Sequence, residues 1–307
     1  MRKRIGWWVA LCISILGGLS GVSCWAQDTQ AVVSVFPSGQ TFTLIQEAID
    51  AADAYDTIVI REGTYHENVV IGKPLTLIGL DNVPILPVDR ELPAILIEET
   101  DGVIIHNIGI EDVDVGIKIS QSSTVIKNCH FQTAEIGIDF VGVGPVTASI
   151  DDCTFRGDGF GVRAGGEGSL QVSRCEFKGL GYGAFLFGMT YVTVYNCLFE
   201  VCTVGVMLSS TVSATLVENH MEDTYLYGIQ VAGVPFDVPQ APLVLIANTI
   251  RNSTQWGISL CTSTDPFELA FEGEVKGFGN IIDGGHGYGP MCPTDYEWPI
   301  GFFAEDG

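Results

Sequence analysis

The chain has 307 residues, of which 37 are Asp or Glu and 14 are Lys or Arg, so its formal net charge is −23. Nucleic acids and anionic lipids are bound through cationic surfaces, and this charge balance excludes both as expected partners. The same charge repels polyanions at long range unless bound cations bridge the two. The length could hold two domains, but one repeat pattern runs through most of the chain, and we expect a single domain.

Residues 1–26 have the layout of a secretory signal peptide. A basic start at residues 2–4 precedes an apolar stretch at 5–22, and a small-residue site ends at Ala26. We predict cleavage after Ala26. The alternative is lipoprotein processing at Cys24, which would leave an acylated membrane anchor and is the one case in which we expect a membrane partner. The mature chain, residues 27–307, is therefore expected to be secreted, periplasmic or attached to the cell surface.

Residues 27–57 are predicted to cap the first coil of a repeat structure. Residues 43–46 (Thr-Leu-Ile-Gln) have the form of a capping box, and residues 44–52 carry apolar side chains at helical spacing. We expect a short amphipathic helix here, because the open end of a solenoid has to be sealed. Strand-like runs then follow at residues 58–60, 69–71 and 75–78.

From residue 108 onward one short pattern recurs, most often at a step of about 22 residues. Its first position holds Ile108, Cys129, Cys153, Cys175, Cys197, Asn219, Asn248 and Asn280. Two residues later come Ile110, Phe131, Phe155, Phe177, Phe199, Met221, Ile250 and Ile282. A glycine follows the first position by eight or nine residues, at Gly116, Gly137, Gly161, Gly183, Gly205, Gly228, Gly257 and Gly289. Such self-similarity predicts an all-β solenoid with three short strands per coil, a single-stranded parallel β-helix.

The cysteines at the first repeat position are predicted to stack as buried free thiols, because neighbouring parallel strands lie about 4.8 Å apart and buried Cys behaves as a small hydrophobe. The asparagines that follow would continue the column as a ladder of side-chain amides. Cys261 and Cys292 lie outside this column and are the disulfide candidates in an exported protein. Residues 290–307 are expected to form an apolar plug at the C-terminal end.

The N-terminal segment carries a more specific signature. Residues 43–49, 58–60, 63–65, 67–68 and 75–79 resemble the entry segment of pectin-lyase-like right-handed β-helix proteins. That group includes pectin methylesterases, polygalacturonases, and NosD-like and carbohydrate-binding β-helix proteins. The resemblance implies this fold over nearly all of the mature chain, with a ligand groove along one parallel sheet and its bordering loops. The shared residues build coils, so the resemblance is specific for fold and weak for activity.

The strand that begins at the repeat glycine is the candidate ligand strand. If Ile138 and Phe140 point inward, Asp139 points outward, because successive strand side chains alternate. The same phase predicts an outward column of Lys118, Asp139, Arg163, Phe185, Met207, Gln230 and Ser259. Its first three members would lie side by side, either as a surface charge ladder or as a binding site for sugar carboxylates or hydroxyls.

An aromatic residue often precedes the repeat glycine, as at Phe160, Tyr182, Tyr227 and Trp256. Strict alternation predicts that these side chains point inward. If the glycine bends the chain, they would instead emerge at the rim of the groove, where aromatic faces stack on sugar rings. The candidate substrate-binding residues are therefore Lys118, Asp139, Arg163, Tyr182, Phe185 and Trp256.

The catalytic motifs of the resembled enzymes are not matched. Pectin methylesterases carry Asp in a Gln-Asp-Thr and an Asp-Phe-Ile-Phe-Gly stretch, whereas residues 182–184 and 204–206, at the same repeat phase here, hold no carboxylate. Polygalacturonases carry a Gly-His-Gly, which is present at residues 285–287 near Asp283. No basic motif follows it and no Asn-Thr-Asp precedes it, so we expect a chance triplet in a Gly-rich loop.

Other acidic groupings leave alternatives open. Asp139, Asp158 and Arg163 would be the catalytic candidates of a lyase or hydrolase. Asp151 and Asp152 would suit paired carboxylates, although they precede a turn where acidic residues are ordinary. The acidic runs at 98–101 and 111–114 would suit calcium or would be plain solvated loops.

The histidines do not suggest a metal site. His130 and His220 share a repeat phase but lie four coils apart, on the order of 19 Å at the spacing of parallel strands. No Cys or His spacing resembles a transition-metal site either. We therefore expect no cofactor, calcium being the one metal that the acidic runs would suit.

The sequence favours an exported, monomeric β-helix protein that binds extracellular or envelope polysaccharide, or another cell-surface component, without catalysis. One alternative is a secreted polysaccharide lyase or glycoside hydrolase acting in a groove along one parallel sheet. The second is a NosD-like periplasmic maturation factor, which the fold allows and no residue specifically supports.

Overall fold

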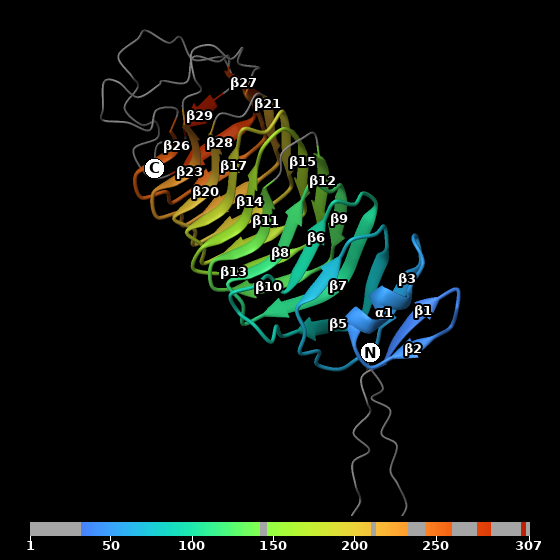
Figure 1. Ribbon diagram of the computed structural model, residues 1–307. Coiled ribbons are helices and arrows are strands. Elements are labelled where there is room, and N and C mark those ends of the chain that lie inside the picture. The colour runs from blue at the N-terminus through green and yellow to red at the C-terminus, as the bar shows by residue number, and fades with distance from the viewer. Residues whose placement is uncertain are drawn as a thin grey trace, which may run out of the picture.

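The computed structural model describes residues 32–141, 146–209, 213–232, 243–259, 275–283 and 302–304. The predicted signal peptide, the disulfide candidates Cys261 and Cys292, the triplet at 285–287 and most of the predicted plug at 290–307 lie outside these residues. Within the described part of the chain, no helix is long and apolar enough to span a membrane. Figure 1 shows the strands stacked coil upon coil along one axis, with α1 (Ile45–Ala51) at the N-terminal end.

The described strands form a parallel β-helix, as the repeat pattern predicted. A nine-stranded sheet makes one face: β4 (Val69–Ile71), β6 (Ile95–Glu98), β8 (Val115–Ser120), β11 (Ile136–Val141), β14 (Phe160–Gly165), β17 (Tyr182–Phe187), β20 (Val204–Ser209), β23 (Tyr227–Ala232) and β26 (Trp256–Ser259). Each strand pairs in parallel with its counterpart one coil away, and Phe160 of β14, for example, pairs with Tyr182 of β17.

A 20-stranded sheet makes the other faces of the described coils. One of its rows comprises β9 (Thr124–Lys127), β12 (Val146–Asp151), β15 (Gly168–Ser173), β18 (Tyr191–Tyr195), β21 (Ser213–Val217), β24 (Leu243–Ile246) and β27 (Val275–Phe278). The next row comprises β10 (His130–Thr133), β13 (Thr154–Gly157), β16 (Glu176–Lys178), β19 (Leu198–Glu200), β22 (His220–Glu222), β25 (Thr249–Arg251), β28 (Asn280–Asp283) and β29 (Phe302–Ala304).

The first coils depart from this regular pattern. They contain β1 (Val33–Phe36), β2 (Thr41–Phe42), β3 (Thr57–Ile60), β5 (Thr76–Ile85) and β7 (Val103–Glu111). β1 pairs antiparallel with β2 and with β3, so an antiparallel ribbon closes the first coil, and the apolar face of α1 is buried beside it. The expected capping helix and the three expected strand runs are confirmed. The bounds of the predicted cap, residues 27–57, stay a prediction.

The capping box predicted at residues 43–46 is wrong. The helix begins at Ile45, and its N-cap is Leu44, which offers no capping side chain. The carboxylate of Glu67 caps the helix instead: its Oε1 accepts a 2.7 Å hydrogen bond from the backbone N–H of Ile45, and its Oε2 a 3.0 Å bond from that of Gln46. The first turn of α1 is therefore satisfied by a residue brought close by the tertiary fold.

The interior is built from side-chain ladders that repeat once per coil. The rings of Phe131, Phe155, Phe177 and Phe199 stack with centroid distances of 4.8, 4.8 and 4.6 Å. The predicted thiol ladder is confirmed, with free buried cysteines at positions 129, 153, 175 and 197, and Cys202 is a further free buried thiol. Because identical side chains meet between these four coils, each of them packs against a coil with the same interior side chains.

The asparagine column continues the thiol ladder with hydrogen bonds, as predicted. Nδ2 of Asn219 donates to the carbonyl oxygen of Val194 at 2.9 Å and to Oδ1 of Asn248 at 2.9 Å. Asn248 repeats this arrangement toward Leu216 and Asn280, with distances of 2.8 and 3.0 Å. These buried amides are therefore satisfied on both sides, as a buried polar group requires.

The repeat glycine is fixed by its surroundings and shifts the side-chain alternation. A Cβ at Gly161 would lie 2.5 Å from Cδ1 of the Phe177 ring and 2.6 Å from the carbonyl oxygen of Gly183 in the next coil. Val162, the next residue, is also fully buried. Two successive residues therefore face the interior, and Phe160, on the other side of the glycine, faces outward.

Candidate ligand-binding surface

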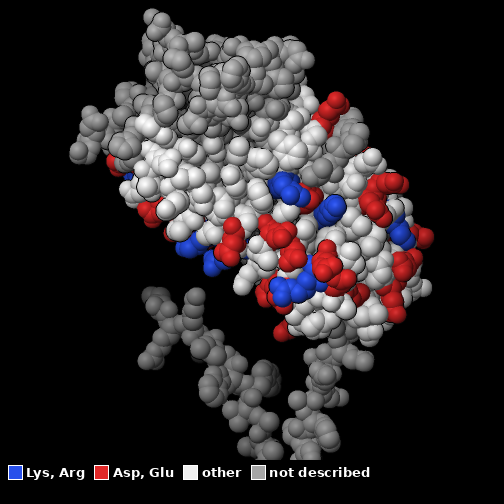
Figure 2. Space-filling view, turned by 60° about the vertical axis from the view of Figure 1, so that its left-hand side comes forward, with Lys and Arg blue, Asp and Glu red and all other residues white. Residues whose placement is uncertain are grey.

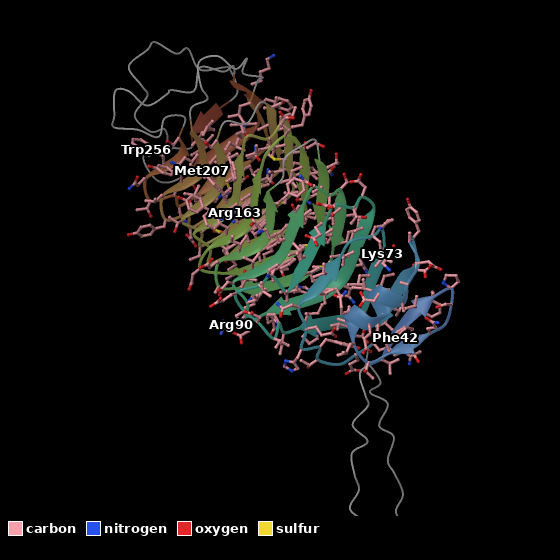
Figure 3. The ribbon with its side chains drawn as sticks, viewed as in Figure 1. Phe42, Lys73, Arg90, Arg163, Met207 and Trp256 are labelled. Atoms are coloured by element: carbon pink, nitrogen blue, oxygen red, sulfur yellow. The ribbon has the colours of Figure 1, made fainter. Side chains whose placement is uncertain are left out.

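The register of the nine-stranded sheet aligns the predicted outward column. Lys118 pairs with Asp139, and Asp139 pairs with Arg163. The column then continues through Phe185, Met207, Gln230 and Ser259. Figure 3 shows Arg163, Met207 and Trp256 following one another toward the C-terminal end on the side of this sheet. The phase derived from the sequence is therefore right along this strand row.

Arg163 and Asp139 form a two-point ion pair on this face. Nε of Arg163 donates to Oδ1 of Asp139 at 2.9 Å, and Nη2 donates to Oδ2 at 2.8 Å. The Asp139 side chain is 5% exposed and that of Arg163 is 34% exposed, so the pair is partly shielded from water. The hydrogen bond to Asp139 raises the pKa of the Arg163 guanidinium above its usual value. Both carboxylate oxygens of Asp139 are thus occupied by one cation.

Asp158 does not join this pair. Its side chain lies exposed in the turn before β14, and its backbone carbonyl accepts a 3.0 Å hydrogen bond from the N–H of Gly181. Among the ion pairs of the described residues, Arg163 contacts Asp139 and not Asp158. The second acidic neighbour that acts on Arg163 electrostatically is Glu135. No sequence signal pointed to Glu135, because it lies in a loop whose position depends on the coil geometry.

Aromatic side chains form a continuous outer surface beside this pair, and we call Phe160, Tyr182, Phe185 and Phe187 the aromatic cluster. The Phe160 and Tyr182 rings stack at 5.1 Å with an interplanar angle of 9°. Each also lies 5.7 Å from the tilted ring of Phe185, and Phe185 lies 5.4 Å from Phe187. The guanidinium carbon of Arg163 is 6.0 Å from the Phe160 centroid. All four aromatic side chains are half-buried.

The inward orientation that strict alternation predicted is therefore wrong for Phe160 and Tyr182. Both rings contact Phe185, whose neighbours along the strand, Ala184 and Leu186, are fully buried on the inner side. The cause is the repeat glycine, which makes two successive residues face inward. The alternative orientation, with the rings at the outer face, is the observed one. Tyr227 and Trp256 continue the same register position farther along the sheet.

Phe187 was missed by sequence reasoning, although a signal was present. Its partner in the preceding coil is Gly165, and a Cβ at that glycine would lie 2.1 Å from the Phe187 ring. A glycine and a phenylalanine at the same position of successive coils thus indicate a ring lying over the neighbouring backbone. This contact extends the aromatic cluster by one side chain.

Asp151 and Asp152 belong to a turn on another face. Asp152 adopts a left-handed conformation with φ of 51°. Oδ1 of Asp151 accepts a 2.8 Å hydrogen bond from the hydroxyl of Ser173, and Arg174 forms ion pairs with both carboxylates. Their hydrogen bonds and ion pairs are those of turn residues rather than those of a catalytic pair.

The acidic runs do not converge on a metal site in the described part of the chain. No group of three or more His, Cys, Asp or Glu side chains is placed to hold a metal ion there. Asp112, in the second acidic run, forms a 2.7 Å ion pair with Arg90. His130 and His220 lie on β10 and β22, so four coils separate them, as the repeat phase predicted.

The family model for the right-handed β-helix region matches residues 137–292, which is just over half of the chain. The chain therefore belongs to the right-handed β-helix family. A comparison with curated proteins found no match. The alginate lyase from Paenibacillus sp. str. FPU-7 superposes with a TM-score of 0.50 at 11% identity, over 79% of this chain and 94% of that one.

Two further solved structures are similar at lower scores. A pectin methylesterase in complex with hexasaccharide VII gives a TM-score of 0.49 at 13% identity, over 88% of this chain and 90% of that one. The catalytic unit of a GH87 α-1,3-glucanase from Streptomyces thermodiastaticus strain HF3-3 gives 0.44 at 13% identity, over 81% and 67%. At such identities likeness shows a shared fold, and the pectin-lyase-like resemblance seen in the sequence is confirmed at that level.

Proposed function

We propose that this protein is an exported, glycan-binding β-helix protein whose ligand lies on the outer face of the nine-stranded sheet and is not chemically changed there. The observation that carries the proposal is the aromatic cluster next to the Arg163–Asp139 pair. The alginate lyase that shares the fold is named for action on a polysaccharide, which is in line with a carbohydrate ligand.

The chemistry of the cluster suits a sugar ring. Aromatic faces offer rigid apolar area to the C–H face of a saccharide, and the cluster rings are already held by one another. A guanidinium has five N–H donors, and Arg163 uses two of them on Asp139. The remaining N–H groups are available to sugar hydroxyls. Apolar stacking area beside a fixed donor is the usual composition of a ligand site.

The state of the carboxylates supports binding over catalysis. Glycoside hydrolysis uses two carboxyl groups about 5 to 9 Å apart, one of which donates a proton. Asp139 has both oxygens engaged by Arg163, and Asp158 makes no contact with the pair among the described residues. A lyase would pair a basic residue with an acidic cluster that is bridged to the substrate by a cation. Here Arg163 and Asp139 are bound directly to each other. Export and a monomeric state remain predictions.

The test is a glycan panel probed with residues 27–307, with and without calcium, reading binding and product release together. We expect binding without products. Release of unsaturated or reducing ends would overturn the non-catalytic assignment and would make Asp139, Asp158 and Arg163 the first positions to substitute. Absence of binding to every glycan would overturn the proposal.

A matched pair of variants locates the surface. Tyr182→Ala removes a ring of the aromatic cluster and should reduce affinity by about tenfold or more, equivalent to about 1.4 kcal/mol. Tyr191→Ala removes a tyrosine that is 63% exposed on β18, in the 20-stranded sheet, and should leave binding unchanged. Equal effects of the two substitutions would place the ligand elsewhere.

A further inference from the structure

We infer that the glycan taken by this surface is neutral, without carboxylate or sulfate groups, and that it lies on the C-terminal half of the nine-stranded sheet, over β17, β20, β23 and β26. The inference rests on the proposed glycan-binding function and names the ligand class. The outward column has a charged part at its N-terminal end and an uncharged part at its C-terminal end.

The two halves of the sheet differ in charge. β8, β11 and β14 each place one charged residue in the outward column, namely Lys118, Asp139 and Arg163. The segments 182–187, 204–209, 227–232 and 256–259, which form the next four strands, contain no Asp, Glu, Lys or Arg. In Figure 2 charged atoms gather toward the N-terminal end, and a largely white area covers the coils toward the C-terminal end.

The cations of the coils that carry the aromatic cluster are all engaged by carboxylates, and Arg251, in the coil that carries β26, lies on β25 of the 20-stranded sheet rather than on this face. Residues 154–232 contain four Lys and Arg residues against seven Asp and Glu residues. Arg156 pairs with Glu176 at 3.5 Å, and Lys178 pairs closely with Glu200. The other two, Arg163 and Arg174, are paired with Asp139 and with Asp151 and Asp152. An anionic sugar on the aromatic cluster therefore meets no unpaired cation from these coils.

Lys118 does not alter this conclusion, because it lies too far along the column. Three strand spacings separate it from Phe185, which is about 14 Å at about 4.8 Å per step. That separation exceeds the screening length of about 8 Å at physiological ionic strength. Asp139 also lies between Lys118 and the aromatic cluster. The net charge of −23 adds a long-range repulsion of polyanions.

The uncharged half offers the groups that a neutral sugar needs. Tyr182 has a phenolic hydroxyl and Gln230 a side-chain amide, and each can donate to and accept from sugar hydroxyls. A uronate would have to lose water from its carboxylate over the rings of Phe185 and its neighbours without gaining a counter-charge, which is costly. A neutral sugar loses only hydroxyl hydration, which these polar groups replace. The balance favours the neutral ligand.

The experiment compares a soluble neutral glucan with the carboxymethylated form of the same glucan, so that the backbone is held constant. Binding to residues 27–307 is measured at low and at high salt, with polygalacturonate and alginate as further anionic probes. We expect the neutral glucan to bind about tenfold tighter or more than its carboxymethylated form. Added salt should leave the neutral affinity unchanged.

Each outcome has a distinct meaning. Equal or tighter binding of the anionic glycans would overturn this inference and leave the proposed function standing. Absence of binding to all of these glycans would overturn both. Preference for the neutral glucan supports both.

A gain-of-function variant provides an independent check. Met207→Lys places a cation in the column directly beside Phe185, in the uncharged half. This change should raise affinity for the carboxymethylated glucan by about tenfold and leave the neutral glucan close to its original affinity. Lys127→Ala, which removes an exposed cation from β9 in the 20-stranded sheet, is the control and should change neither affinity. A Met207→Lys variant that folds normally by circular dichroism but keeps the original ratio of affinities for the neutral and the carboxymethylated glucan would argue against the placement of the ligand.

Discussion

Phe177 shows at the level of one residue how the coils are held together. Its ring is fully buried and stacks between Phe155 and Phe199, with ring centroids 4.8 and 4.6 Å apart. Removing it leaves a cavity that the two neighbouring rings cannot fill without breaking their own packing. The repeat pattern alone located this residue, because large apolar side chains recur at its phase in successive coils and stacked coils bury that shared apolar column.

Phe177→Ala should lower the free energy of unfolding by about 3 to 5 kcal/mol, through lost burial and a residual cavity. The measurement is urea unfolding followed by circular dichroism. Tyr191→Ala, an exposed aromatic truncation, should stay within about 0.5 kcal/mol of the parent protein. A Phe177→Ala variant with a nearly unchanged free energy of unfolding would mean that the phenylalanine stack contributes little to the stability of the core.

Cys202 gives the molecule a sensitivity to alkaline pH. Burial raises the pKa of its thiol to about 11 from a usual value of 9.0. The folded state therefore holds the proton more tightly than the unfolded state does, and this contribution to stability is complete below pH 9 and is lost as the pH rises toward 11. Denaturation midpoints should fall across this window, and Cys202→Ala should reduce the fall. If the denaturation midpoint of the variant falls with pH as steeply as that of the parent protein, the effect belongs to other groups.

At the level of elements, the repeat pattern predicts the position of the strands but not the orientation of every side chain on them. The strand rows, the ladders and the outward column follow from the repeat period, and their phase was read directly from Cys, Phe and Gly positions. The outward orientation of Phe160 and Tyr182 did not follow, because alternation assumes a regular strand. The inward glycine interrupts that regularity, and only the backbone contact of Gly161 with the next coil reveals it.

The prediction of the capping box at α1 failed for a different reason. A capping box is a local signal within four residues, whereas the observed cap, Glu67, is 22 residues from Ile45 in sequence. Similarly, Asp139 and Arg163 were expected side by side, but no sequence pattern determined the two-point pairing that occupies both oxygens of Asp139. Contacts between coils depend on side-chain conformations that register alone does not determine.

Glu67→Ala should destabilise the N-terminal end by about 1 to 2 kcal/mol, because two backbone N–H groups of α1 lose their acceptor. Hydrogen exchange of the amides of Ile45 and Gln46 should quicken in the variant. Glu47→Ala, which removes an exposed carboxylate from the same first turn, is the control and should leave those amides protected. Equal effects of the two substitutions would indicate a general charge effect rather than a cap.

At the level of the whole molecule, the proposed function depends on export. The layout of residues 1–26 predicts that the mature protein begins at Gln27. Mass spectrometry of the protein recovered from a secreting host should give the mass of residues 27–307. A lipid-modified chain starting at Cys24 would instead establish lipoprotein processing and place the protein on a membrane. Retention of residues 1–26 in the recovered protein would contradict export by this route.

In the regular coils each strand pairs in parallel with its counterparts in the coils before and after it, and this has a consequence for how such a protein changes length. β14 pairs with β11 before it and with β17 after it, and Phe160 of β14 and Tyr182 of β17 occupy equivalent positions. Excising or duplicating the chain between two such positions would join equivalent points and keep every ladder in phase. The face would then shorten or lengthen by one step of about 4.8 Å. Under the proposed function, the number of coils would therefore set the length of glycan that the sheet can contact.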